Sequence, residues 1–261
     1  MSPLVALVRE PSATLAECAL SYLQRTPIDL FRARSQHAGY CAALRAAGAE
    51  VRVLPALDHL ADAVFVEDTA VIVDELAVLG APGEPARAPE ADAIEPAIRA
   101  HRPVRRLSPS RATLEGGDVL RAGRTLFVGR SRRTNEAGVE ALRHLLEPLG
   151  YRVIALRVEG CLHLKTACSA AADTLIVVNP AWVDRRVFER EGLDTLPVAP
   201  GEPWAANVLR VSATLLVARG HPATLRRLRG AGLDPVELDI GEFQKAEAGL
   251  TCLSLLVTEG A

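Results

Sequence analysis

Apolar and polar residues along this chain form short segments that recur in a fixed order. Alternation with a period of two predicts a strand at 50–54, whereas an apolar stripe with helical spacing predicts a helix over 31–48. From residue 64 onward, two strands, a helix and a further strand repeat. Thr134 is the expected N-cap of the helix over 135–149. The expected strands of these repeats are 64–66, 69–73, 76–79, 104–107, 118–120, 125–129, 151–158, 163–169, 174–178, 195–198, 207–211, 214–217 and 235–238, and the helices are 90–101, 135–149, 184–189 and 222–228.

A fifth repeat is complete only when the two ends of the chain are joined. The apolar segment 251–257 would pair with 4–8, and the helix over 31–48 and the strand at 50–54 would follow. A repeat that joins the ends implies that the units close into a ring. The chain has 261 residues, of which 49% are hydrophobic, so we expect one compact domain over 1–261.

Charge and cysteine content exclude several classes of protein. The formal net charge is −2 and the charges are mixed, so neither nucleic acid nor an anionic membrane is an expected partner. The first ten residues are typical of a strand, not of a signal peptide or a membrane span. Five cysteines without a C-x-x-C pair predict reduced thiols and a cytoplasmic location. Cys161, His163 and Cys168 lack a fourth ligand at a familiar spacing, so no zinc site is expected.

Reactive side chains occupy equivalent positions near the first strand of each repeat. Equivalent positions in a ring lie around its axis on one face, so we expect these side chains to converge. A cysteine nucleophile needs a histidine that is close in space but not necessarily in sequence. The residues are Glu67, Asp68, Glu115, His163, Asn207 and Cys252.

Each of these residues also has a purely structural interpretation. A free cysteine is commonly a core residue, and His163 stands between two leucines, as a core histidine would. Glu67, Asp68 and Glu115 could belong to turns. The carboxylates nevertheless adjoin apolar segments, and buried charges need partners. A cationic ligand would supply one.

Five motifs, in order and with compatible spacing, resemble those of the dimethylarginine dimethylaminohydrolases. That family belongs to the guanidine-modifying (amidinotransferase) superfamily. The resemblance covers essentially the whole chain, and it implies an α/β fold, the pentein, in which five αββαβ units form a five-bladed propeller around a pseudo-fivefold axis. The matching segments are 62–68, 114–120, 129–135, 162–166 and 249–254.

The resemblance also implies a hydrolytic mechanism without a metal or cofactor. Cys252 would attack the guanidinium carbon of a methylated arginine, and the bound cation would help to lower the pKa of the thiol. His163 would protonate the departing amine and then activate a water that hydrolyses the covalent thiouronium, giving citrulline. Glu115 would hold His163 in its protonated form.

Further positions correspond to residues that contact the substrate in the family. Asp68 would bind the guanidino nitrogens, and Arg87 and Arg133 would bind the substrate carboxylate. The segment 17–25 would act as a lid that excludes water. The remaining expected contacts are Leu20, Asp62, Glu67 and the backbone at Ala246.

The choice of substrate within the superfamily depends on few residues. Arginine deiminases usually carry an aspartate where this chain has Lys165, and the missing acceptor favours a methylated guanidinium. The chain departs from the family at Ala88 and at 247–249. These departures leave the chemistry intact but the exact substrate open, so that a deiminase-like, citrulline-directed or other ureido or guanidino hydrolase is an alternative. Two further hypotheses are a non-catalytic binder of cationic amino acids and an amidinotransferase. The expected partner is a small molecule, and a homodimer is compatible with the exposed outer strands.

Overall fold

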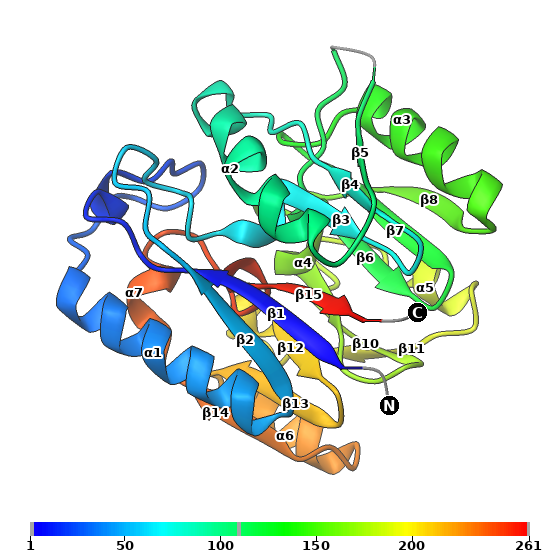
Figure 1. Cartoon of the computed structure of the whole chain (residues 1–261). Coiled ribbons are helices and arrows are strands. Elements are labelled where there is room, and N and C mark those ends of the chain that lie inside the picture. Colours follow the sequence, from blue (N-terminus) through cyan, green and yellow to red (C-terminus); the bar gives the residue numbers. More distant parts are fainter. Residues whose placement is uncertain (1–2, 109–110, 260–261) are drawn as a thin grey trace.

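The strands of the protein form five separate three-stranded sheets around a common centre (Figure 1). The computed structural model describes residues 3–108 and 111–259. Within each sheet the inner strand pairs antiparallel with the middle strand, and the middle strand pairs parallel with the outer strand. This arrangement confirms the expected pentein fold.

The sheets follow one another along the chain, except that the last strand joins the first two. From inner to outer strand they are β15 (Leu255–Thr258), β1 (Leu4–Arg9) and β2 (Ala49–Leu54); β3 (Ala70–Ile72), β4 (Ala77–Leu79) and β5 (Val104–Arg106); β6 (Val119–Ala122), β7 (Thr125–Arg130) and β8 (Arg152–Arg157); β9 (Cys168–Ala170), β10 (Leu175–Val178) and β11 (Asp194–Pro197); and β12 (Val208–Val211), β13 (Thr214–Ala218) and β14 (Pro235–Leu238).

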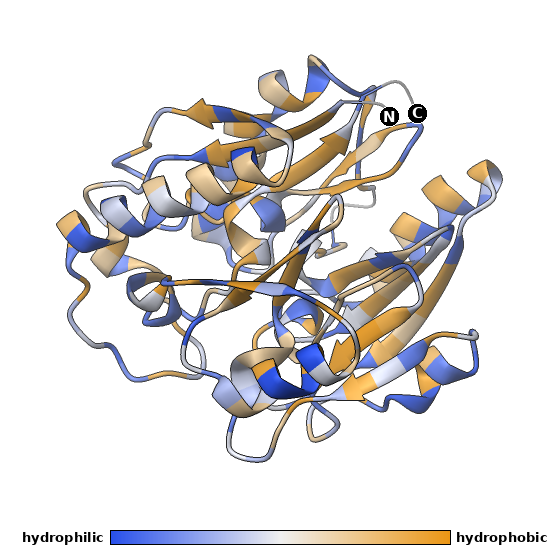
Figure 2. Cartoon of the chain, turned by 90° about the horizontal axis from the view of Figure 1, so that it is seen from below, coloured by the Kyte–Doolittle hydropathy of each residue, from blue (hydrophilic) through white to orange (hydrophobic). Residues whose placement is uncertain are grey.

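A helix connects the middle strand of each sheet to the parallel outer strand, as a crossover connection requires. Apolar residues concentrate on the strands, whereas the helices carry both apolar and polar residues (Figure 2). The described residues contain no helix that is both long and apolar enough to cross a membrane. The connecting helices are α1 (Leu30–Ala46), α2 (Ala88–Arg99), α3 (Glu136–Leu146), α5 (Arg186–Glu189) and α6 (Pro222–Gly230), and a further short helix is α7 (Gly241–Gln244).

A short helical turn precedes the inner strand of every sheet. The turns are η2 (Val66–Thr69), η4 (Gly116–Asp118), α4 (Leu164–Ala167), η6 (Pro203–Ala206) and η7 (Thr251–Leu253). The turns η7, η2, η4, α4 and η6 contact one another in that order around the centre of the ring, and inner strands of neighbouring sheets also meet there. Gly116 shows how close the approach is, because a Cβ at this position would lie 2.0 Å from the carbonyl oxygen of Glu67.

These turns correct three of the expected strands. The segment 64–66 is buried but leads into η2, because its apolar side chains anchor the turn and do not form a ladder. The expected strand at 163–169 is α4 followed by β9, and the first three residues of 251–257 form η7. The remaining expected strands and helices are present, with shifts of a few residues at their ends.

The N-cap of α3 is Asn135 and not Thr134. The side chain of Asn135 accepts a hydrogen bond from the backbone N–H of Gly138 at 2.8 Å. The hydroxyl of Thr134 instead accepts the backbone N–H of Glu115 at 3.1 Å. Thr134 therefore connects the start of the helix to the turn η4.

Two helical glycines give a test of the packing between elements. A Cβ at Gly138 in α3 would lie 2.0 Å from the carbonyl oxygen of Thr113, whereas a Cβ at Gly39 in α1 would meet nothing within 4 Å. Gly39→Ala should stabilise the protein by about 0.5–1 kcal/mol, because alanine favours a helix. Gly138→Ala should destabilise it by about 1–3 kcal/mol, because the helix must shift. Urea unfolding of both variants measures the difference, and equal stabilisation would contradict the packing described here.

Candidate active site

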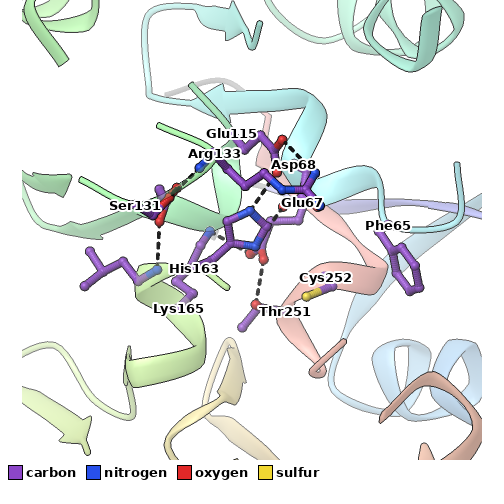
Figure 3. A network of polar contacts seen from close by, with 12 residues as sticks. Phe65, Glu67, Asp68, Glu115, Ser131, Arg133, His163, Lys165, Thr251 and Cys252 are labelled. Carbon is purple, nitrogen blue, oxygen red and sulfur yellow. Dashed lines mark hydrogen bonds and ion pairs between the residues drawn. The ribbon is translucent and has the colours of Figure 1, made fainter. Parts of the chain in front are cut away.

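Cys252 lies on η7 at the centre of the ring, where its side chain is almost completely buried. The residue is 8% exposed, and its sulfur accepts the backbone N–H of Gly249 at 3.4 Å. Figure 3 shows the sulfur pointing toward the part of the site that holds His163. Burial, followed by the charges of Glu67 and Asp68, raises the pKa of the Cys252 thiol well above its usual range. The thiol is therefore neutral in the free protein at neutral pH.

His163 and Glu115 form a buried ion pair beside this cysteine. His163 precedes α4 and is 3% exposed, and its Nε2 lies 2.7 Å from Oε2 of Glu115, which is fully buried. Burial opposes the charge of the imidazolium, but the carboxylates of Asp68, Asp118 and Glu115 outweigh it and raise the pKa of His163 to about 9. The pair therefore stabilises the fold fully below about pH 6.5, and this contribution is lost as the pH rises through about 9.

The second oxygen of Glu115 has its own donors. Oε1 accepts the backbone N–H of Gly83 at 3.0 Å and a guanidinium N–H of Arg133 at 3.3 Å. Burial alone would raise the pKa of Glu115, but the hydrogen bond and charge of His163, together with the charges of Arg87 and Arg133, lower the pKa to about 2. Glu115 is thus a permanent anion that keeps His163 protonated.

Asp68 has one satisfied and one open oxygen. Oδ2 accepts Nη1 of Arg87 at 2.8 Å, whereas Oδ1 has no hydrogen-bond partner among the described residues. Oδ1 lies 3.7 Å from Nδ1 of His163, too far for a hydrogen bond. A Cβ at Gly117 would lie within 2.7 Å of both atoms, so this glycine closes one side of the space they share. Oδ1 of Asp68, an acceptor without a partner, and Nδ1 of His163, a donor, therefore face the same small space.

The two arginines of the expected substrate site are buried in the same network. Arg87 is fully engaged, because its Nε and Nη2 bind Glu90 and its Nη1 binds Asp68. Arg133 has a single side-chain bond among the described residues, to Glu115. Arg133 therefore retains N–H groups that are free for another anion.

Glu67 lies at the floor of the site between two donors. Its Oε1 binds Nζ of Lys165 at 2.6 Å, and its Oε2 accepts the hydroxyl of Thr251 at 2.6 Å. The side chain of Asn207 completes the floor by donating to the carbonyl of Lys165 and accepting the backbone N–H of Thr251. Burial raises the pKa of Glu67 against the opposing charge of Lys165. The structure thus brings together five of the six expected residues of the ring as Figure 3 shows, and the hydrogen bonds of Asn207 to Lys165 and Thr251 place the sixth beside them.

The remaining expected contacts lie at the rim of the site. The carboxylate of Asp62 accepts the backbone N–H of Ala19 at 3.1 Å, which fixes the start of the segment that carries Leu20. Leu20 packs against a core cluster that includes Ala246 and Cys252. Leu20 and Ala246 therefore belong to the same apolar cluster as the cysteine.

The sequence and the structure both match known proteins. Residues 23–195 match the model of the family described as N,N dimethylarginine dimethylhydrolase, eukaryotic. The chain is 40% identical to the N(G),N(G)-dimethylarginine dimethylaminohydrolase of Streptomyces coelicolor, over 97% of each chain. This chain belongs to the dimethylarginine dimethylaminohydrolase family.

Solved structures of dimethylarginine dimethylaminohydrolases share the fold. A cysteine-to-serine variant of the Pseudomonas aeruginosa enzyme, in complex with citrulline, is 26% identical with a TM-score of 0.90, and the match covers 98% of this chain and 99% of that one. A second dimethylarginine dimethylaminohydrolase, an adduct with S-methyl-L-thiocitrulline, is 27% identical with a TM-score of 0.91, over 98% and 100% of the chains. The ligands of these relatives are small molecules.

Asp118, which lies within the motif 114–120 and has no role predicted from the sequence, is fully buried and its charge acts on His163. Its Oδ1 accepts the backbone N–H of Leu164 at 2.9 Å, and its Oδ2 accepts the hydroxyl of Ser131 at 2.6 Å. Burial raises the pKa of Asp118 to about 6 against the charge of His163. Its position three residues after Glu115, behind two glycines, is the signal that could have identified it.

Three possible metal ligands meet in this site, but their protonation and charge do not suit a metal ion. Ligand atoms of Asp68, Glu115 and His163 lie within 4.8 Å of one another. A protonated imidazole has no lone pair to offer, and the raised pKa of His163 keeps it protonated at neutral pH. The guanidinium groups of Arg87 and Arg133 also already neutralise the two carboxylates.

Removal of the Asp118 charge should lower the pKa of His163. In Asp118→Asn the isosteric amide removes one of the carboxylates that stabilise the imidazolium, so the titration should move down by roughly one pH unit. NMR of the His163 ring between pH 5 and 10 measures the shift. Asp173→Asn is the control, because Asp173 is an exposed carboxylate that pairs only with Arg210 among the described residues. An unchanged titration in Asp118→Asn would contradict this account.

Proposed function

We propose that this protein hydrolyses methylated arginine to citrulline and a methylamine, with Cys252 as nucleophile, His163 as acid and base, and Glu115 as the partner of His163. The observation that carries the proposal is the open Oδ1 of Asp68 beside Nδ1 of an imidazolium, next to a buried thiol. A guanidinium donates to the first group, and its departing nitrogen can receive a proton from the second. The family assignment supports the same reaction.

The first half of the reaction forms a covalent intermediate. The bound guanidinium adds a positive charge beside Cys252 and lowers the pKa of the thiol, which releases its proton to solvent; the resulting thiolate attacks the central carbon. A carbon–sulfur bond forms. Nδ1 of His163 gives its proton to the dimethylamino nitrogen, the carbon–nitrogen bond breaks, and dimethylamine leaves. The product is an S-alkylthiouronium on Cys252 and a neutral His163.

The second half returns the enzyme to its starting state. Neutral His163 takes a proton from a water molecule, whose oxygen attacks the thiouronium carbon. The carbon–sulfur bond breaks, citrulline leaves, and the sulfur departs as a thiolate that is protonated again. Glu115 keeps its negative charge throughout and stabilises each imidazolium that forms.

The substrate carboxylate is assigned to Arg133 more than to Arg87. Arg133 has N–H groups without partners among the described residues, and these suit a planar anion. Arg87 is fully occupied by Asp68 and Glu90, so its role is to fix the position of Asp68. The backbone carbonyls of the segments around Leu20 and Ala246, with the carboxylate of Asp62, would receive the substrate ammonium group.

The ion pair at the floor of the site favours a methylated substrate. Lys165 neutralises Glu67 at 2.6 Å, so Glu67 lacks the free carboxylate that an unmethylated guanidinium would need for its second NH₂ group. A dimethylated nitrogen has no N–H and requires no such acceptor. This ion pair therefore favours methylated arginine as the substrate over the free arginine of a deiminase-like activity.

The substrate proposal is tested by measuring citrulline release from asymmetric dimethylarginine, monomethylarginine and arginine in parallel. The methylated substrates should have a kcat/KM at least about tenfold higher than arginine, because an unpaired N–H group in the site costs affinity. Dimethylamine is measured as the co-product, and Cys252→Ser should release none. Preference for arginine would contradict the proposed role of Lys165.

A pair of alkylating reagents tests whether a cation activates the thiol. A chloromethyl amidinium and its neutral chloromethyl amide have nearly the same shape, but only the amidinium can lower the pKa of Cys252 and bind Asp68. At pH 7 the amidinium should inactivate the protein at least about 100-fold faster, since two pKa units correspond to that factor. Equal rates would show that the free protein already holds a thiolate.

We also propose that residues 1–261 form a single catalytic unit that works in the cytoplasm as a homodimer. The pairing of β15 with β1 ties the two ends of the chain into one sheet, which supports the first part. All five cysteines are free, which suits a reducing compartment.

Val53 on β2 and Val236 on β14 are exposed apolar residues on outer strands, which supports a dimer interface on these strands. Sedimentation analysis of the purified protein tests the dimer.

A further inference from the structure

The segment 18–25 between β1 and α1 crosses the rim of the site without regular secondary structure. Residues 22–27 are exposed, and Leu23, Gln24 and Thr26 border a cavity of about 440 Å³. Little apolar packing therefore holds the outer half of this segment in place. Its position must depend on polar contacts.

The strongest of these contacts comes from Glu247. Its Oε1 accepts three successive backbone N–H groups, those of Ser21 at 2.9 Å, Tyr22 at 2.5 Å and Leu23 at 2.6 Å. Glu247 is 7% exposed, so these bonds to a carboxylate are shielded from water. Its φ of +61° places it among the few non-glycine residues in the left-handed region, which orients the side chain toward the segment.

Weaker contacts hold the segment elsewhere. The guanidinium of Arg132 lies 5.5 Å from the centre of the Tyr22 ring, and Asp62 accepts the N–H of Ala19. Arg25 donates to the carbonyl oxygens of Ala16 and Cys18, which closes the segment on its own base. None of these contacts reaches the loop that carries the cysteine.

We propose that Glu247 is the latch that holds the 18–25 segment closed over the pocket, and that release of its three N–H groups admits substrate and frees product. Glu247 follows Ala246 and precedes Gly249, whose N–H contacts the sulfur of Cys252. The lid is thus fastened directly to the loop that carries the nucleophile. Glu247 acts through the lid, so it is a positioning residue and not a catalytic one.

If Glu247 is a latch, its substitution should have other effects than if it only shapes the loop that carries Cys252. A residue that only shapes the cysteine loop would affect kcat when changed, because it would displace Cys252. A latch affects how often the lid opens, and so it affects KM and the accessibility of the lid while Cys252 stays in place. The prediction about KM rests on the proposed function, whereas the prediction about the accessibility of the lid does not depend on it.

Limited proteolysis of the substrate-free protein tests the latch without any assay of activity. Arg25 lies in the lid, and although the residue is exposed, its guanidinium is bound to the carbonyls of Ala16 and Cys18, so trypsin can bind this side chain only when the segment opens and these bonds break. In Glu247→Gln the carboxamide keeps the shape but loses the charge, and cleavage between Arg25 and Thr26 should be roughly tenfold faster. Glu247→Ala should be cleaved faster still.

The matched control is Glu202→Gln. Glu202 also accepts two successive backbone N–H groups, those of Ala223 and Thr224, but at the start of α6 and away from the lid. This variant should be cleaved after Arg25 at the parent rate. A Glu247→Gln protein that is also cleaved at the parent rate overturns the latch, whether or not methylarginine proves to be the substrate.

Steady-state kinetics complete the test. With asymmetric dimethylarginine, Glu247→Gln should raise KM roughly tenfold while kcat changes less than about threefold. Thermal unfolding should place the variant close to the parent. A fall in kcat with unchanged KM assigns Glu247 to the cysteine loop and overturns the latch. If no substrate reacts with the parent protein, the proposed function fails, and proteolysis alone decides the latch.

Discussion

The hydrogen bond between His163 and Glu115 is the interaction on which the centre of this protein depends. Both residues are almost completely buried, and separated charges at that depth would cost several kcal/mol each. The surrounding structure supplies what the pair requires: the guanidinium of Arg133 and a backbone N–H on Glu115, and the carboxylates of Asp68 and Asp118 around His163.

The ring explains how residues so far apart in sequence form one site, and it limits what the sequence could predict. The repeat of strands and helices, and the closure of the ends, predicted the ring and the convergence of Glu115, His163 and Cys252. The apolar segments at 64–66, 163–169 and 251–257 predict strands where the structure has turns, because burial in a turn and burial in a sheet leave the same pattern. The contact of Glu247 with Ser21 spans 226 positions, and no local signal indicates such a contact.

The acids that would attract a cationic substrate add to the effect of burial in keeping the thiol neutral until that substrate arrives. Burial, followed by the charges of Glu67 and Asp68, raises the pKa of Cys252 in the free protein, and a bound guanidinium would offset those charges. A neutral buried thiol resists oxidation and alkylation, because the thiolate is the reactive form. Selectivity for the substrate and protection of the nucleophile therefore follow from one arrangement of charges, and a change that strengthened one would weaken the other.

This arrangement also requires that the pocket be closed during the reaction. Water that entered would screen Asp68 and the imidazolium from the guanidinium and would weaken the effect of the cation on the thiol. A lid without much apolar packing can open easily, so it needs a polar fastening that is strong when shielded and weak once water reaches it. Three N–H groups on one buried carboxylate oxygen have this property. Their acceptor belongs to the loop that carries Cys252, so closure of the lid and placement of the nucleophile depend on the same short segment.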